Sequence, residues 1–177
     1  MNIQETPLKD CFILESVIFK DNRGYFLESF NQKKFQELTG LNTVFVQDNE
    51  SFSRYGVIRG LHFQKDEFQQ SKLVRAVKGK VLDVVVDFRK DSDTFGQHFS
   101  VILDDENKKQ LFVPKGFLHG FSVLSEEAIL SYKCDQYYNP AAESGIRFDD
   151  PAFKIDWKIP EGKRIISEKD MALPGFK

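Results

Sequence analysis

The chain has 177 residues, of which 41% are hydrophobic and 29% charged, a composition that excludes intrinsic disorder and fits one domain over residues 1–177. Its 25 Lys and Arg against 27 Asp and Glu leave a net charge of −2, without the basic excess that is typical of a nucleic-acid binder. No apolar run approaches the roughly 20 residues of a membrane helix, and no secretion signal is visible at the N-terminus. The two cysteines cannot form a disulfide framework. We therefore expect a cytoplasmic protein without nucleic-acid or membrane partners.

Short predicted strands follow one another along most of the chain. Apolar and alternating runs predict strands over 12–19, 26–30, 43–49, 72–77, 80–88, 98–103, 110–113, 121–124 and 128–132. They recur about every 8 to 15 residues, with Gly, Asn or Asp between many of them, which is typical of an all-β barrel or double-sheet jelly roll. Lys78-Gly79 and the segment Asp105 to Asn107 predict the turns of two tight hairpins.

One helix is predicted after the second of these strands. Asn31 is a good N-cap, Phe35 and Leu38 share one helical face, and Gly40 stands where a helix C-terminal glycine belongs. After Tyr138 four prolines interrupt the pattern, and we expect short helical turns and a tail packed against the barrel.

The three histidines differ in their surroundings. His98 has no other chemically active group beside it and is interpreted as structural. His62 follows Gly60-Leu61, three residues after Arg59, and His119 lies between Gly116 and Gly120. Two histidines in similar glycine-rich contexts at strand ends favour a functional site.

These two glycine-histidine segments resemble the two motifs of the cupin superfamily, whose members are small jelly-roll barrels with a site inside the barrel. Metal-binding cupins usually carry a second histidine two residues after the first, and Gln64 occupies that position here, with only Asp66 and Glu67 as nearby carboxylates. Because catalytic transition metals usually need about three protein ligands, we expect no metal.

A narrower resemblance covers nearly the whole chain. The segments 21–28 (DNRGYFLE), 47–49 (QDN), 59–62 (RGLH), 116–121 (GFLHGF), 132–134 (YKC) and 167–170 (SEKD) follow one another as in the dTDP-4-dehydrorhamnose 3,5-epimerase family. This resemblance implies a cupin-type jelly-roll barrel with a few short helices. It also implies epimerisation at C3 and C5 of dTDP-4-dehydro-6-deoxy-D-glucose, on the route to dTDP-L-rhamnose, without a metal or redox cofactor.

The resemblance assigns the acid–base chemistry to four residues. His62 is the implied base, because a carbon acid beside a ketone needs a base that titrates near neutral pH. Asp170 is its implied carboxylate partner, with Asp83 as an alternative partner of His62 or Lys72. Lys72 matches the group that stabilises the enolate oxygen. Tyr132 matches the acid that reprotonates the sugar from the opposite face.

The remaining family positions imply contacts with the dTDP-sugar substrate. Arg23, Arg59 and Lys169 are expected to neutralise the diphosphate. Tyr138 is expected to stack on the thymine. The other implied substrate-binding residues are Glu28, Gln47, Asp48, Asn49, Lys72, His119 and Glu143.

A homodimer is also expected. The chain contains 18 Phe, and large aromatic residues are enriched at subunit interfaces. The resemblance implies that N-terminal strands cross between subunits and bring Arg23 and Glu28 to the partner's nucleotide pocket.

Three alternatives share parts of this pattern. An enzyme that inverts a single carbon, or moves the ketone, would need the same base and acid. A metal-dependent cupin enzyme is disfavoured by Gln64. A non-catalytic sugar-nucleotide binder is disfavoured because binding alone needs no pair of His62 and Tyr132.

Overall fold

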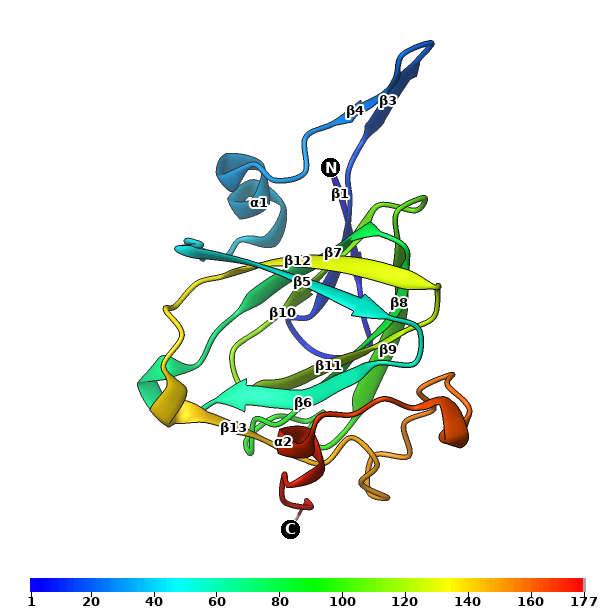
Figure 1. The fold of residues 1–177 in the computed structure, drawn as a ribbon. Helices are drawn as coiled ribbons and strands as arrows, with labels where there is room; N and C mark the ends of the chain where they lie inside the picture. Colours follow the sequence, from blue (N-terminus) through cyan, green and yellow to red (C-terminus); the bar gives the residue numbers. More distant parts are fainter. Residues whose placement is uncertain (177) are drawn as a thin grey trace.

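The computed structural model describes residues 1–176, and eleven of its strands form two antiparallel sheets that face each other as a barrel (Figure 1). The six-stranded sheet has the order β1 (Asn2–Glu5), β2 (Phe12–Glu15), β10 (Lys109–Val113), β7 (Lys72–Lys78), β12 (Glu127–Cys134) and β5 (Gln47–Arg54). The five-stranded sheet has the order β13 (Glu143–Gly145), β6 (Ile58–Gln64), β11 (Phe117–Val123), β8 (Lys80–Asp87) and β9 (His98–Asp104). This two-sheet barrel confirms the predicted all-β fold. Lys177, the last residue of the expected domain, lies outside the described residues.

The interior of the barrel is filled by side chains from both sheets. Val74 and Leu130 of the six-stranded sheet pack with Val85 and Phe121 of the five-stranded sheet. Every second residue of a strand points to the same face, so the next residues of β8 point outward. There Val84 and its neighbours are covered by the C-terminal segment, and for this reason β8 is apolar on both faces.

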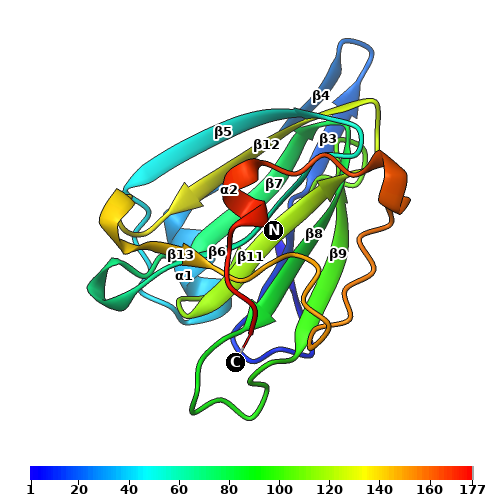
Figure 2. The ribbon, with the colours of Figure 1, turned by 60° about the horizontal axis from the view of Figure 1, so that its bottom comes forward.

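Both outer faces are covered by helical or irregular segments. Helix α1 (Gln32–Thr39) has the predicted caps, Asn31 and Gly40, and packs Phe35 against the six-stranded sheet. The segment after β13 wraps around the five-stranded sheet and includes α2 (Glu168–Met171) beside β6 (Figure 2), as expected for an irregular tail. Single 3-10 turns lie at Asp66–Phe68, Pro140–Ala142 and Glu161–Lys163. No helix within residues 1–176 is long and apolar enough to span a membrane.

Several predicted strand boundaries are wrong. The strand expected over 12–19 is two elements, because β2 ends at Glu15 and β3 (Ile18–Asp21) pairs instead with β4 (Gly24–Leu27) in a separate hairpin. The strand expected over 26–30 therefore ends at Leu27. The strand expected over 43–49 begins only at Gln47 and continues to Arg54.

The two predicted tight hairpins are also wrong, because both turns carry the chain from one sheet to the other. Lys78-Gly79 joins β7 to β8, and the turn after Asp104 joins β9 to β10. Gly79 has a φ of 73°, and a Cβ at this position would lie 2.1 Å from the carbonyl oxygen of Glu127. Only glycine fits at this corner, because both the backbone conformation and the close approach exclude a side chain.

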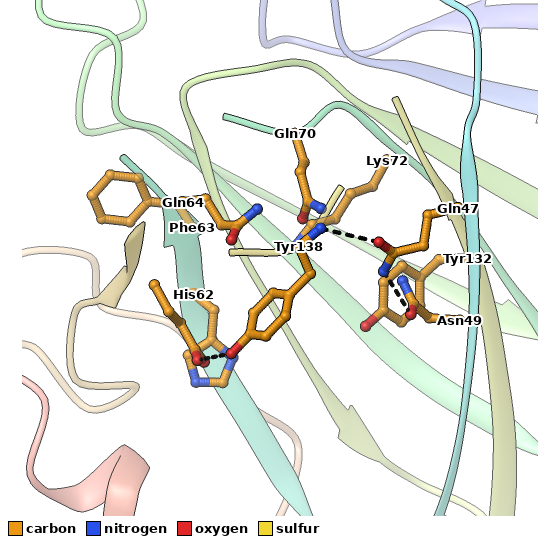
Figure 3. Close-up of a pocket in the computed structure, with 10 residues that line it drawn as sticks. Gln47, Asn49, His62, Phe63, Gln64, Gln70, Lys72, Tyr132 and Tyr138 are labelled. Carbon is orange, nitrogen blue, oxygen red and sulfur yellow. Dashed lines mark hydrogen bonds between the residues drawn. The ribbon is translucent and has the colours of Figure 1, made fainter. Parts of the chain in front are cut away.

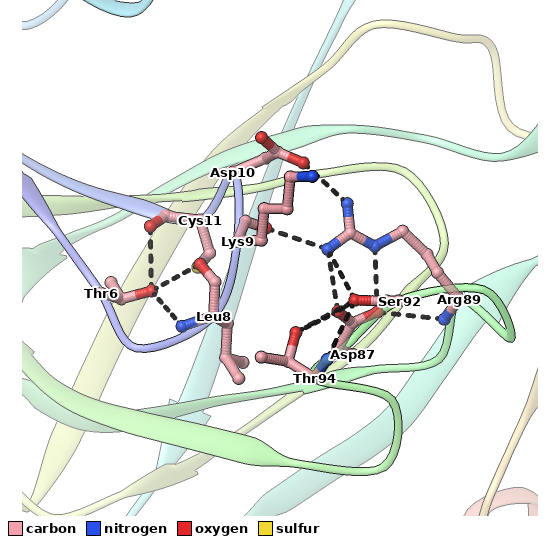
Figure 4. Close-up of polar contacts among 9 residues, drawn as sticks. All are labelled: Thr6, Leu8, Lys9, Asp10, Cys11, Asp87, Arg89, Ser92 and Thr94. Atoms are coloured by element: carbon pink, nitrogen blue, oxygen red, sulfur yellow. Dashed lines mark hydrogen bonds and ion pairs between the residues drawn. The ribbon is translucent and has the colours of Figure 1, made fainter.

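A buried carboxylate fastens the loop after β8 to the connection between β1 and β2 (Figure 4). Asp87 is fully buried and accepts hydrogen bonds from Arg89 Nη2 (2.8 Å), Ser92 Oγ (2.5 Å) and Thr94 Oγ1 (2.6 Å). Arg89 in turn pairs with Asp10 at 2.9 Å. Burial alone would raise the pKa of Asp87, but the donors outweigh it and lower the pKa to about 2.

Candidate active site

A cavity of about 300 Å³ opens between the two sheets (Figure 3). Its lining comes from β6 and β13 on one side and from β5, β7 and β12 on the other. The lining residues are Gln47, Asn49, His62, Phe63, Gln64, Gln70, Lys72, Tyr132, Tyr138 and Glu143. Six of the predicted site residues therefore share this cavity with His62.

His62 and Asp170 form a hydrogen-bonded pair. Strand β6 presents the imidazole, and its Nε2 lies 2.8 Å from Oδ1 of Asp170 in α2. The side chain of Asp170 is 6% exposed, whereas that of His62 is 29% exposed toward the cavity. Burial opposes ionisation of Asp170, but the contacts with His62 and with the Gly60 amide outweigh it and lower the pKa of this carboxyl. Asp170 is thus an ionised group that orients the imidazole and can stabilise its protonated form.

Gly60 allows β6 to approach β11 closely and also contacts Asp170. Gly60 has a φ of 123°, and a Cβ there would lie 2.6 Å from the Cα of Gly120 on β11. The Gly60 amide also donates to Oδ2 of Asp170 at 3.2 Å. The carboxylate therefore accepts from both the backbone and the side chain of the same strand.

Tyr132 and Lys72 face the cavity from the opposite sheet. Lys72 Nζ lies 5.9 Å from the ring centroid of Tyr132. In the part of the chain that the structure describes, neither Lys72 Nζ nor the Tyr132 hydroxyl has a hydrogen-bond partner, so both are free to contact a ligand. Burial raises the pKa of the Tyr132 phenol and lowers the pKa of the Lys72 ammonium. The phenol is protonated at neutral pH and can act as an acid.

The rim of the cavity is a connected polar cluster. The Tyr138 hydroxyl donates to Oε2 of Glu143 at 2.5 Å, and Lys169 Nζ lies 2.6 Å from the same oxygen. The backbone amide of Tyr138 donates to Oε1 of Gln47, which also donates from Nε2 to Asn49. Burial opposes ionisation of Glu143, but Lys169 and Tyr138 lower its pKa, so the rim carries an ion pair.

A second cavity of about 430 Å³ continues from the first, because His62 and Glu143 line both. Arg59 and Lys169 lie on its walls, together with Asp170 and the backbone segment that precedes α2. Arg59 Nε is held by Ser53 Oγ at 3.2 Å. The second cavity therefore offers two cations directly beside the His62 cavity.

Four predicted site residues lie elsewhere. Asp48 alternates with Gln47 and Asn49 along β5, so its side chain points to the other face of the sheet and pairs with Lys133 at 2.9 Å. Arg23 pairs with Asp21 on the β3–β4 hairpin, and Glu28 pairs with Lys34. Both lie outside the two cavities of their own chain.

His119 is the fourth, and its position shows which histidine pairs with Asp83. His119 is 7% exposed and lies beside His62 on the neighbouring strand, with Nε2 at 3.0 Å from both carboxylate oxygens of Asp83. Asp83 is therefore the partner of His119, and Asp170 is the partner of His62.

Gln64 has a structural task at the position where metal-binding cupins carry a second histidine. Its Nε2 donates to the Phe68 carbonyl at 3.0 Å, and its Oε1 accepts from the Asn139 amide at 2.7 Å. Within residues 1–176 no group of three or more His, Cys, Asp or Glu side chains is arranged to hold a metal ion. The side chains present do not fit a metal centre at this position.

Sequence reasoning missed Phe63, Gln70 and the Gly60 amide as parts of the site. Phe63 and Gly60 lie within the glycine-rich segment around His62, so the sequence already places them near the predicted site. Gln70 follows a 3-10 turn and has no motif of its own. A backbone donor such as the Gly60 N–H cannot be identified from the types of side chain in the sequence.

Comparison with known proteins points to one family. The family model for dTDP-4-dehydrorhamnose 3,5-epimerase matches residues 5–177. The dTDP-4-dehydrorhamnose 3,5-epimerase of Methanothermobacter thermautotrophicus is 51% identical over 167 residues, which cover 94% of this chain and 89% of the relative. The crystal structure of that enzyme from Elizabethkingia anophelis NUHP1 superposes with a TM-score of 0.96 at 56% identity, covering 99% of this chain and 96% of the other. A dTDP-6-deoxy-D-glucose-3,5-epimerase from Legionella pneumophila Philadelphia 1, solved with dTDP-4-keto-L-rhamnose, has a TM-score of 0.93 at 45% identity and covers 99% and 98%.

Proposed function

The chain belongs to the dTDP-4-dehydrorhamnose 3,5-epimerase family, and on that premise we propose that His62 and Tyr132 are the base and acid with which it inverts C3 and C5 of dTDP-4-dehydro-6-deoxy-D-glucose. The observation that carries this proposal is the placement of an imidazole and a protonated phenol on opposite sheets, facing one cavity. Inversion requires that a proton leave one face of the sugar and arrive at the other, and two facing sheets supply the two faces.

The first step is proton removal beside the C4 ketone. His62 takes the proton from the carbon, the C–H electron pair becomes the enolate, and the negative charge moves to the C4 oxygen. Asp170 at 2.8 Å stabilises the imidazolium that forms. Lys72 lines the same cavity, and its ammonium has no hydrogen-bond partner within residues 1–176. It is therefore suited to stabilise the charge on the enolate oxygen.

The second step is proton delivery from the other side. Tyr132 gives its phenolic proton to the enolate carbon, the ketone re-forms, and the carbon is inverted. Exchange with solvent then returns the proton to Tyr132 and removes the proton from His62. C3 and C5 both flank the ketone, so the same pair serves each carbon in turn, in dTDP-L-rhamnose biosynthesis.

The second cavity suits the nucleotide part of the substrate. Arg59 and Lys169 offer positive charge for the diphosphate, and Tyr138 at the rim offers an aromatic face for the thymine. Gln47 and Asn49 supply polar contacts in the first cavity, and Glu143 supplies one where the two cavities meet. The two volumes lie within the usual range of about 300–1,000 Å³ for ligand pockets.

We further propose that the protein acts as a homodimer through the β3–β4 hairpin. This hairpin extends beyond the barrel (Figure 1) and leaves Phe19 61% and Phe26 69% exposed. An isolated two-stranded hairpin is only marginally stable in water, so its exposed apolar side chains are expected to pack against a partner surface. A second copy would bring Arg23 and Glu28 of one protomer to the nucleotide cavity of its partner, burying at least about 1,600 Å². The double variant Phe19→Ser/Phe26→Ser should be monomeric by light scattering; a monomeric wild-type protein at micromolar concentration contradicts the proposal.

The cytoplasm is the compartment we propose for this activity. Cys11 and Cys134 are both buried as free thiols, which suits a reducing environment.

The test of the base is solvent deuterium uptake into the dTDP-4-keto sugar. His62→Asn should lower uptake by about 10²–10⁴-fold, the usual contribution of a general base, while dTDP binding is retained. His98→Asn is the matched control, because His98 is exposed on β9 and outside the cavity. Uptake in His62→Asn at the wild-type rate would show that another group is the base.

A further inference from the structure

The carboxylate that pairs with His62 stands on a very short helix. Helix α2 has only four residues, Glu168–Met171, and Ser167 Oγ caps it by accepting from the Asp170 amide at 3.1 Å. A helix of this length has no independent stability, because helix nucleation is unfavourable. Besides the contacts of its carboxylate with His62 and the Gly60 amide, the segments on either side of the helix therefore fix the position of Asp170.

The segment before α2 is held by the backbone of β6. The Ile58 amide donates to the Ile165 carbonyl at 3.0 Å, and the Ile165 amide donates to the Gly56 carbonyl at 2.8 Å. These contacts end two residues before the cap. They fix where α2 begins and leave its far end undetermined.

The segment after α2 is held by contacts of a different kind. The Pro174 carbonyl accepts from the Arg147 amide at 3.0 Å, and the Phe176 amide donates to Oδ2 of Asp150 at 2.7 Å. The Phe176 ring packs among three other phenyl rings, with centroid distances of 5.1 Å to Phe153, 5.9 Å to Phe95 and 6.0 Å to Phe88. The cluster reaches the site, because Phe88 lies 5.4 Å from Phe63, the neighbour of His62 in the cavity wall.

We propose that Phe176 is a positioning residue for the epimerisation: its ring anchors the segment after α2 and thereby keeps the Asp170 carboxylate on Nε2 of His62. This inference rests on the proposed function, in which the pair of His62 and Asp170 is the base. Phe176 lines neither cavity, and in this proposal it acts through the helix before it and not through Phe88 and Phe63. A displacement of a catalytic group by about 1 Å costs up to about 10²-fold in rate, so a loosened anchor is measurable.

The first experiment compares two phenylalanines of the same cluster. Phe176→Ala should lower kcat and deuterium uptake by about tenfold or more, while the affinity for dTDP is unchanged. Phe95→Ala is the control, because Phe95 contacts Phe88 and Phe176 of this cluster but lies on the loop between β8 and β9. Phe176→Leu keeps an apolar anchor and should recover most of the rate. A wild-type rate in Phe176→Ala, or equal losses in Phe176→Ala and Phe95→Ala, overturns the proposal.

The second experiment is a double-mutant cycle with Asp170→Asn. If Phe176 acts through Asp170, Phe176→Ala should cause no further loss in the Asp170→Asn background. Additive losses would mean that Phe176 acts by another route. Full activity of Asp170→Asn alone would instead refute the proposed base pair, so the two failures are distinguishable. The thermal unfolding midpoint of each variant should lie above the assay temperature, which verifies that the measured protein is folded.

Discussion

Replacing Tyr132 by phenylalanine should separate proton removal from inversion. Within residues 1–176 the Tyr132 hydroxyl has no hydrogen-bond partner, so Tyr132→Phe breaks no internal hydrogen bond and keeps the volume of the ring. We expect the free energy of unfolding to change by less than about 1 kcal/mol, the typical net value of one hydrogen bond. The loss of one general acid lowers the rate by about 10²–10⁴-fold, or about 3–5 kcal/mol in the activation free energy.

Two assays on the same sample test this expectation. His62 and Asp170 are untouched in Tyr132→Phe, so His62 can still remove a proton and return a deuteron to the same face. Mass spectrometry should therefore detect deuterium in the dTDP-4-keto sugar, while NMR detects little inverted product. Equal losses in the two assays would assign Tyr132 a binding or structural role. Full activity in both would assign the acid to another group, with Tyr138 as the next candidate.

Three further expectations concern residues outside the acid–base pair. Gly79→Ala should destabilise the fold by several kcal/mol, measured by denaturant unfolding, because its Cβ would lie 2.1 Å from the Glu127 carbonyl oxygen; a change below about 1 kcal/mol would contradict the corner geometry. Asp87 has a pKa of about 2, below the usual 3.8, so it contributes about 2 kcal/mol above pH 4 that is lost as the pH falls toward 2. Between about pH 4 and pH 2 the free energy of unfolding should therefore fall more steeply for the wild type than for Asp87→Asn. Asp83→Asn should cost about 1–3 kcal/mol of stability, because it weakens the buried hydrogen bond with His119, and unchanged stability would argue against that pairing.

The barrel could be predicted from the sequence, but the path of the chain through it could not. Spacing of apolar runs identifies strands because each must bury one face. Whether a turn such as Lys78-Gly79 joins two strands of one sheet or crosses to the other depends on which sheet can accept the next strand. That choice is made by contacts far apart in the chain. Strand β6 was missed because Gly60 weakens its pattern, although the Gly60 backbone serves the site.

The site shows the same division between local and distant information. Strand alternation places Gln47 and Asn49 in the cavity and turns Asp48 away, and this could have been worked out had the strand boundaries been known. The pairing of His62 with Asp170, rather than with Asp83, depends on how an irregular tail folds back over the barrel. No periodicity in the sequence encodes that return.

In the proposed mechanism, the placement of His62 and Tyr132 on opposite sheets makes stereochemical fidelity depend on the whole interior of the barrel. The width of the gap between them is set by the packing of residues such as Val74 and Val85, which do not line the cavity. In that mechanism, proton exchange needs only the His62 wall of the cavity, whereas inversion needs both walls. As warming or core substitution loosens the contact between the sheets, the ratio of inverted to merely exchanged sugar should fall before total proton turnover does. A product ratio would thus report on the interior of the barrel while the protein is still folded.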